Sequence, residues 1–125
     1  MTPQSHFLGL RTSIYRVTDM EKAKAWYSQV LGSDPYFDQP FYIGFEIAGY
    51  ELGLQPDKVT GKKADNIHVY WGVEDILKSH GRLLTLGAKP HTNPENVGDG
   101  IWVATVKDPW GNVFGIIQNP HFKLP

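Results

Sequence analysis

An internal repeat constrains this chain more than any other feature of its sequence. The repeat consists of two pairs of similar segments: RVTDMEKAKAWYSQVLGSDP (16–35) with GVEDILKSHGRLLTLGAKP (72–90), and GYELGLQ (49–55) with GNVFGIIQ (111–118). In the first pair Asp19 matches Asp75, and in the second pair Gly53 matches Gly115. Because the same motifs recur in the same order, the chain is predicted to contain two copies of one structural unit.

Each half contains one segment with the apolar spacing of an amphipathic helix. In the first half the apolar stripe consists of Ala23, Trp26, Tyr27, Val30 and Leu31. In the second half the stripe consists of Ile76, Leu77, His80, Leu83 and Leu84. Residues 18–21 have the spacing of a capping box that begins at Thr18, and Gly32 and Gly87 are placed to end the two helices.

The remaining segments predict one strand before each helix and three strands after it. The predicted strands are 10–17, one near 35–37, 41–48 and 49–55 in the first half, and 66–73, one near 89–91, 101–106 and 111–118 in the second. Residues 92–100 (TNPENVGDG) are predicted to form a long loop at the rim of the fold. The order βαβββ, repeated twice, predicts an α+β fold in a single domain, 1–125, with one module at about 8–56 and the other at about 65–120.

The strand YELGLQP (50–56) contains a glycine where a side chain is expected. Leu52 and Leu54 alternate with polar neighbours, so Gly53 faces the opposite side of the strand without a side chain. Its repeat partner Gly115 has the same position between Phe114 and Ile116. Two interpretations stay open: each glycine marks a bulge or close backbone approach in a bent sheet, or it leaves space for a ligand.

Composition and charge narrow the classes of function. The 125 residues include 12 Lys and Arg, 13 Asp and Glu and no cysteine, which gives a net charge of −1. Without a basic stripe the chain lacks the electrostatic footprint of a nucleic-acid-binding protein, and without cysteine it lacks thiolate chemistry and disulfides. No apolar run approaches the roughly 18 residues that a membrane span needs. We therefore expect a cytoplasmic protein with neither nucleic-acid nor membrane partners.

The combination of RVTDMEKAKAWYSQVLG with the C-terminal segment KDPWGNVFGIIQ resembles the vicinal oxygen chelate superfamily, also called the glyoxalase/bleomycin resistance/dioxygenase family. The resemblance covers almost the whole chain. It implies two βαβββ modules whose curved sheets form an open cup, with one helix behind each sheet. It also implies that two chains associate as a homodimer.

The resemblance further implies a divalent metal held by one residue from each of four strands in the enzymes of the family. The matching positions here are Thr12, Gly53, His68 and Gly115. Only His68 has a side chain that binds such metals well, and Glu51 joins it only if the register shifts by two residues. We therefore predict a protein without a cofactor. Binding of a divalent metal stays open as an alternative, with His68 as the only candidate ligand.

Several polar and aromatic residues share the predicted cup face. The ligand-binding candidates are Thr12, Arg16, Tyr42, Gly53, Gln55, Tyr70 and Gly115. The candidates for catalysis are His68 and Glu51, either of which has the chemistry of a general base. The alternative for His68, Tyr70 and Arg16 is a polar network that serves only the structure.

Three hypotheses about function follow from the sequence. The first is a metal-free protein that binds a small organic molecule in its cup, as bleomycin-resistance-type proteins do. The second is a glyoxalase-type lyase or isomerase, similar to lactoylglutathione lyase, with an altered site. The third is a non-catalytic dimeric scaffold.

Overall fold

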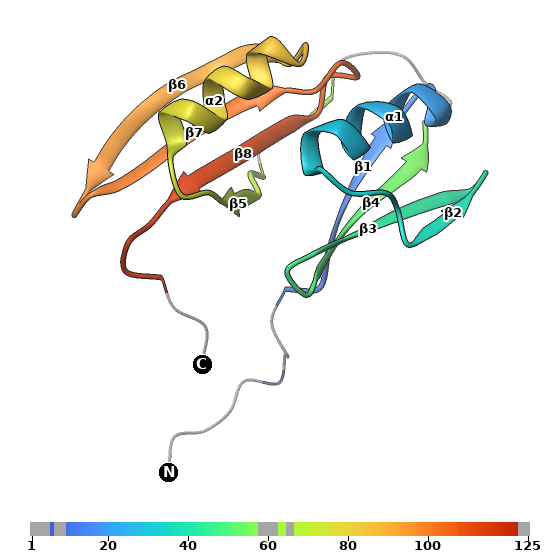
Figure 1. Ribbon diagram of the computed structural model, residues 1–125, viewed down its shortest axis with the longest axis horizontal. Helices are drawn as coiled ribbons and strands as arrows, with labels where there is room; N and C mark the ends of the chain where they lie inside the picture. Colours follow the sequence, from blue (N-terminus) through green and yellow to red (C-terminus); the bar gives the residue numbers. More distant parts are fainter. Residues whose placement is uncertain (1–5, 7–9, 58–62, 65–66, 123–125) are drawn as a thin grey trace. The chain divides into compact units, whose positions relative to one another are not determined.

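The computed structural model describes residues 6, 10–57, 63–64 and 67–122 (Figure 1). The chain divides into two compact units, Met1–Pro56 and Asp57–Pro125. Within these described residues, each unit contains one helix and one four-stranded mixed sheet, in the order βαβββ. The predicted α+β class and the duplicated element order are confirmed.

The first unit contains the sheet β1-β4-β3-β2, in which β1 is parallel to β4 and the other pairs are antiparallel. Its elements are β1 (Thr12–Val17), α1 (Met20–Leu31), β2 (Phe37–Gln39), β3 (Tyr42–Ile47) and β4 (Tyr50–Pro56). Between the parallel strands β1 and β4 the chain passes through α1, β2 and β3. Parallel strands require a long connection of this kind, which usually contains a helix.

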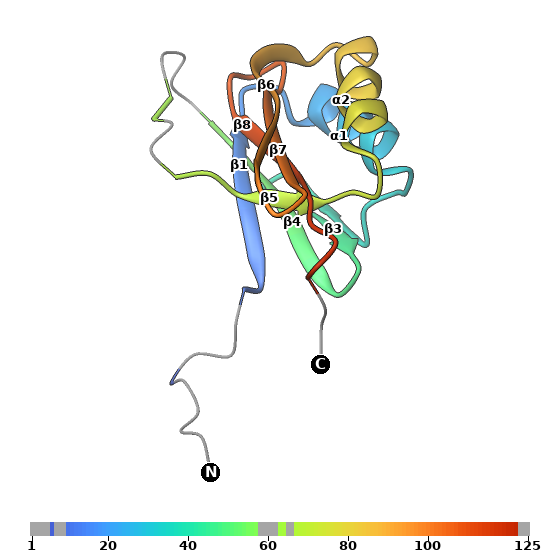
Figure 2. The ribbon, with the colours of Figure 1, turned by 90° about the vertical axis from the view of Figure 1, so that its left-hand side faces the viewer.

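The second unit repeats this topology with the sheet β5-β8-β7-β6. Its elements are β5 (Tyr70–Gly72), α2 (Ile76–Thr85), β6 (Lys89–Gly98), β7 (Ile101–Lys107) and β8 (Val113–Gln118). Figure 2 shows α2 along one face of this sheet. No helix in the described part of this unit covers the other face.

The core of the first unit lies between α1 and one face of its sheet. Tyr15, Leu52, Leu54 and Phe45 alternate along the strands toward this side and are buried. Tyr27 from α1 is fully buried and stacks on Tyr15, with ring centroids 6.0 Å apart. Burial of each such large apolar side chain contributes about 1.5–3 kcal/mol, so this layer provides the main stabilisation of the unit.

The start of α1 differs by one residue from the predicted capping box. Asp19, not Thr18, is the N-cap: its backbone is extended and its carboxylate accepts a hydrogen bond from the Lys22 N–H at 3.0 Å. The carboxylate also has the favourable charge for a helix N-terminus. The predicted end is confirmed, because Gly32 adopts a positive φ of 73° and its N–H bonds to the Ser28 carbonyl.

The second helix begins at the repeat equivalent of the same aspartate. The Asp75 carboxylate accepts a hydrogen bond from the Lys78 N–H at 3.1 Å. In addition, Gln118 Oε1 accepts the Ile76 N–H at 2.9 Å, which ties the end of β8 to the start of α2. Neither α1 nor α2, the helices in the described part of the chain, is long and apolar enough to cross a membrane.

Two predicted boundaries in the second unit were wrong. The segment 92–100 is not a loop, because β6 continues to Gly98 and pairs with β7 through three register shifts. As an edge strand with bulges, β6 tolerates Pro90 and Pro94, whose missing N–H groups would break a central strand. Conversely, β5 spans only Tyr70–Gly72 of the predicted 66–73 strand, and residues 65–66 lie outside the described part of the chain.

Candidate functional site

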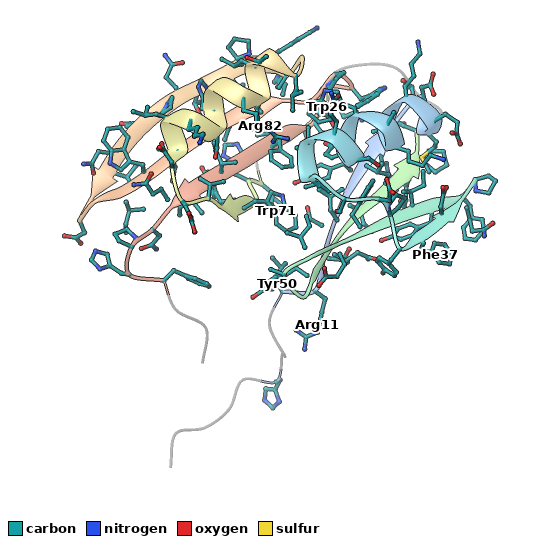
Figure 3. All side chains as sticks on the ribbon, in the orientation of Figure 1. Arg11, Trp26, Phe37, Tyr50, Trp71 and Arg82 are labelled. Carbon is teal, nitrogen blue, oxygen red and sulfur yellow. The ribbon has the colours of Figure 1, made fainter. Side chains whose placement is uncertain are left out.

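The face of the first sheet opposite α1 carries most of the predicted site residues. We call it the open face; it includes Thr12, Ile14, Arg16, Tyr42, Gly44, Glu51, Gly53 and Gln55. These positions alternate with the buried residues of the core, which places their side chains on the other side of the sheet. Figure 3 shows the side chains on this sheet, including Phe37 on β2.

Two glycines, Gly44 on β3 and Gly53 on β4, lie directly opposite each other on this face. A Cβ built on Gly53 would lie 2.7 Å from Cζ of Tyr42. A Cβ built on Gly44 would lie 2.7 Å from Oε2 of Glu51 and 3.2 Å from the Tyr36 ring. The space that the sequence indicated at Gly53 is thus occupied by Tyr42, and the β3–β4 register runs past it without a bulge.

The side chains above the glycine pair converge on the carboxylate of Glu51. Thr12 donates a hydrogen bond to Glu51 Oε1 at 2.8 Å, and the Tyr42 hydroxyl donates to the same oxygen at 2.6 Å. The Tyr36 hydroxyl donates to Oε2. We call these four residues the Glu51 cluster; β1, β3, β4 and the segment before β2 each contribute one of them.

The hydrogen bonds of the cluster determine the charge of Glu51. Partial burial favours the neutral carboxyl, but the hydroxyls of Tyr36, Tyr42 and Thr12 outweigh it and lower the pKa of Glu51 below its ordinary 4.5. The same carboxylate raises the pKa of Tyr36, and burial together with the carboxylate raises the pKa of Tyr42. At neutral pH the cluster is therefore an anion held by neutral hydroxyl donors.

Exposed aromatic rings lie beside the cluster. Phe37 is centred 6.1 Å from the Phe41 ring and 6.1 Å from the Tyr42 ring. Tyr36 and Phe41 are 64% and 65% exposed, and Phe37 is 39% exposed. We call Tyr36, Phe37 and Phe41 the aromatic rim; so many exposed rings at one place are typical of an interaction site.

The other candidates on the open face lie apart from the cluster. Arg16 pairs in register with Gln55, at the far end of β1 from Thr12. Arg16 lies four residue steps along the strand from Thr12, a distance of about 13 Å. The structure thus brings together Thr12, Tyr42 and Glu51 but leaves Arg16 and Gln55 at a separate position.

The second unit places a tyrosine over its own repeat glycine. Tyr70 lies opposite Gly115 on the neighbouring strand, and a Cβ on Gly115 would lie 2.5 Å from the Val69 carbonyl oxygen and 2.8 Å from Tyr70 Cδ1. His68 precedes β5, is exposed, and has its Nδ1 3.5 Å from the Tyr70 hydroxyl. Both glycines are therefore covered, but by tyrosines from different positions in the repeat.

A second polar cluster that the sequence did not indicate adjoins His68. His91 Nδ1 lies 2.7 Å from the hydroxyl of Thr105, which is 2% exposed and also bonds to the Thr92 hydroxyl at 2.6 Å. The rings of His68 and His91 are centred 6.4 Å apart. The alternation of β7 places Thr105 on the face of the sheet opposite Ala104 and Val106. Its pairing with Thr92 of β6 depends on a register shift that the sequence does not reveal.

Sequence reasoning also missed Tyr36 and Gly44. A signal for Gly44 exists, because it alternates with Ile43 and Phe45 as Gly53 does with Leu52 and Leu54. Its importance depends on the register that places it opposite Gly53. Tyr36 precedes β2 and has no periodic signal that would link it to Glu51.

The positions that match the family's metal ligands do not provide a suitable donor set for a divalent ion. Gly53 and Gly115 have no side chain, and Thr12 is a neutral hydroxyl that already donates to Glu51. Only His68 has a strong donor. Among the described residues, no three His, Asp or Glu side chains converge as ligands of one ion would.

Comparison with known proteins places this fold and these repeats in a family. The family model described as Glyoxalase/Bleomycin resistance protein/Dioxygenase superfamily matches residues 5–116. The chain belongs to this superfamily. No protein of curated function matches the chain.

Solved structures of the superfamily share the fold at low sequence identity. A glyoxalase-related enzyme from Fulvimarina pelagi is 18% identical with a TM-score of 0.76, over 95% of this chain and 94% of that one. A glyoxalase/bleomycin resistance protein/dioxygenase family enzyme from Burkholderia phytofirmans PsJN is 18% identical with a TM-score of 0.70, over 86% and 95%. Lactoylglutathione lyase from Agrobacterium tumefaciens is 16% identical with a TM-score of 0.72, over 93% and 98%.

Proposed function

We propose that this superfamily member binds a small organic molecule on its open face, at the Glu51 cluster and the aromatic rim, without a catalytic metal. The observation that carries the proposal is the convergence of Thr12, Tyr36 and Tyr42 on one carboxylate beside exposed rings. A few fixed polar groups next to apolar surface are typical of small-molecule sites.

The absence of suitable side chains at the family's ligand positions supports the metal-free part of the proposal. The proposal also includes the homodimer that the family resemblance implies. Native mass spectrometry of the purified protein measures both properties, because it reports the mass of the assembly and of any bound ion. A stoichiometric divalent metal would contradict the metal-free part.

Binding is tested by thermal unfolding in the presence of a library of small organic molecules that includes neutral, anionic and cationic compounds. We expect at least one compound to raise Tm in a saturable way, because a ligand that binds only the folded state stabilises it by about 2.7 kcal/mol at 100 times its Kd. Backbone amide shifts in NMR should then change at Thr12, Tyr36, Tyr42 and Glu51. A library without any stabilising compound, or shifts confined to other residues, would contradict the proposal.

A glyoxalase-type lyase or isomerase is the second candidate, favoured by the similarity in fold to a lactoylglutathione lyase. In that case His68 is the better candidate for a general base, because the lowered pKa of Glu51 makes its carboxylate a weaker base. The test is turnover that produces or consumes lactoylglutathione and that His68→Ala abolishes. Neither turnover nor stabilisation by ligands is expected of the third alternative, a dimeric scaffold.

A further inference from the structure

Within the described part of the chain, the carboxylate of Glu51 has one hydrogen-bonding position without a donor. An ionised carboxylate has about four lone-pair sites, two on each oxygen. Oε1 accepts from both Thr12 and Tyr42, whereas Oε2 accepts only from Tyr36. Among the described residues no other donor reaches Glu51, so Oε2 can accept one more hydrogen bond.

The same carboxylate has no counter-ion in the described part of the chain. Ion pairs there include those of Lys24 with Glu21 and Asp38 and of Lys63 with Asp57, and none of them involves Glu51. The Arg11 guanidinium donates to the Leu10 carbonyl, and Arg16 lies toward the other end of β1. The three hydroxyls stabilise the negative charge of Glu51 without cancelling it.

The aromatic rim provides the second element of a cation site. Ring faces carry a negative quadrupole and attract ammonium groups. Tyr36 contacts the anion through its hydroxyl, Phe37 lies 6.1 Å from the Tyr42 ring of the cluster, and Phe41 lies 6.1 Å from Phe37. An anionic ligand would be repelled by Glu51, and a carbonyl or ether oxygen has no proton to donate to Oε2. The chemistry that satisfies both features is an N–H-bearing organic cation with an apolar body.

On the basis of the proposed function, we infer that the bound molecule belongs to the class of primary or secondary organic amines. Its ammonium group donates a hydrogen bond to Glu51 Oε2 and contacts the ring of Tyr36. Its apolar part lies against Phe37 and Phe41. This assignment gives the open face a preference for charge as well as for shape.

Three probes of similar size separate charge from shape: benzylammonium, benzyl alcohol and benzoate. Their affinities are measured by NMR titration of the whole protein at an ionic strength of about 0.15 M, where exposed charges more than about 8 Å apart are largely screened. We expect benzylammonium to bind at least about tenfold more tightly than benzyl alcohol, because a hydrogen bond between charged groups is markedly stronger than a neutral one. Benzyltrimethylammonium, which has charge but no N–H, should bind more weakly than benzylammonium.

Two Glu→Gln variants test whether the preference for benzylammonium depends on the Glu51 carboxylate. Glu51→Gln should lower the affinity for benzylammonium about tenfold and leave that for benzyl alcohol within about twofold. Glu21→Gln is the control, because Glu21 has the same charge but lies on α1, on the side of the sheet opposite the open face, where it pairs with Lys24. It should change either affinity by less than about threefold, since exposed charges are screened. Amide spectra of each variant check that it is folded.

The outcomes for the two proposals are distinguishable. Equal or tighter binding of benzyl alcohol or benzoate, or an unchanged preference in Glu51→Gln, would overturn the amine assignment while leaving small-molecule binding intact. Failure of benzylammonium to bind at its solubility limit, when other library compounds stabilise the protein, would also overturn the amine assignment alone. Failure of the entire library would overturn the proposed function itself.

Discussion

Gly44 and Gly53 lie directly opposite each other on β3 and β4, and together they leave room for the Tyr42 ring and the Glu51 carboxylate on the sheet surface. Any larger residue at either position would collide with the cluster. The two glycines therefore determine how the cluster is built, although neither contributes a functional group to it.

The first prediction concerns Gly53→Ala. We expect a loss of about 1–3 kcal/mol in the free energy of unfolding, because the new methyl group overpacks against Tyr42. Urea denaturation measures the loss. Gly72→Ala is the matched control, since Gly72 also lies in a strand but a Cβ there would meet nothing within 4 Å. Equal effects of the two substitutions would contradict the close packing at Gly53.

The second prediction concerns pH. Because the folded pKa of Glu51 lies below its ordinary 4.5, the unfolded state binds more protons between the two values. The contribution of Glu51 to stability is therefore fully present above the ordinary pKa and is lost as pH falls through the folded one. NMR titration of the Glu51 side chain should give a midpoint below 4.5, and Tyr42→Phe should raise it. A midpoint at or above 4.5 in the wild type would show that the hydroxyls do not hold the anion.

The third prediction separates the two residues that could begin α1. Asp19→Ala should destabilise the protein by about 0.5–2 kcal/mol, because it removes the acceptor for the Lys22 N–H. Thr18→Ala should have an effect within about 0.5 kcal/mol, as expected for an exposed residue outside such a contact. Chemical denaturation of both variants provides the comparison, and a larger loss in Thr18→Ala would restore the capping box that the sequence predicted.

The fourth prediction concerns Asp108, which is 1% exposed at the turn between β7 and β8. Its carboxylate accepts hydrogen bonds from the Trp110 N–H at 3.0 Å and from the Asn112 N–H at 2.8 Å. Asp108→Ala would leave these donors without that acceptor, so we expect a loss of about 1–3 kcal/mol in the free energy of unfolding. Asp34→Ala, at an exposed position, is the control. Similar midpoints for both variants in urea would refute a structural role for the Asp108 carboxylate.

The sequence alone predicts the element order because local signals coincide at each step of the repeat. The aspartate before each helix and the alternation of Leu52 and Leu54 are local features, and the structure agrees with both. The continuation of β6 beyond the predicted strand near 89–91 was missed because Pro and Gly normally indicate a loop, whereas a bulged edge strand tolerates them.

The Glu51 cluster could be predicted only in part. Period-two alternation placed Thr12, Tyr42 and Glu51 on one face, but it did not reveal that they touch. Their contacts depend on the register between β1, β4 and β3, and Tyr36 reaches Glu51 from a segment without periodicity. Such long-range contacts are properties of the folded chain and have no signature within a short window of sequence.

The two halves differ in chemistry at the repeat position of Glu51, and this difference has a consequence for the number of ligands that one chain binds. The repeat equivalent of Glu51 is Val113, so the second half has no carboxylate where the first half has its anion. Duplication has preserved the backbone pattern of the two halves while their chemistry has become asymmetric. A chain built from two similar units is therefore expected to bind one amine, not two.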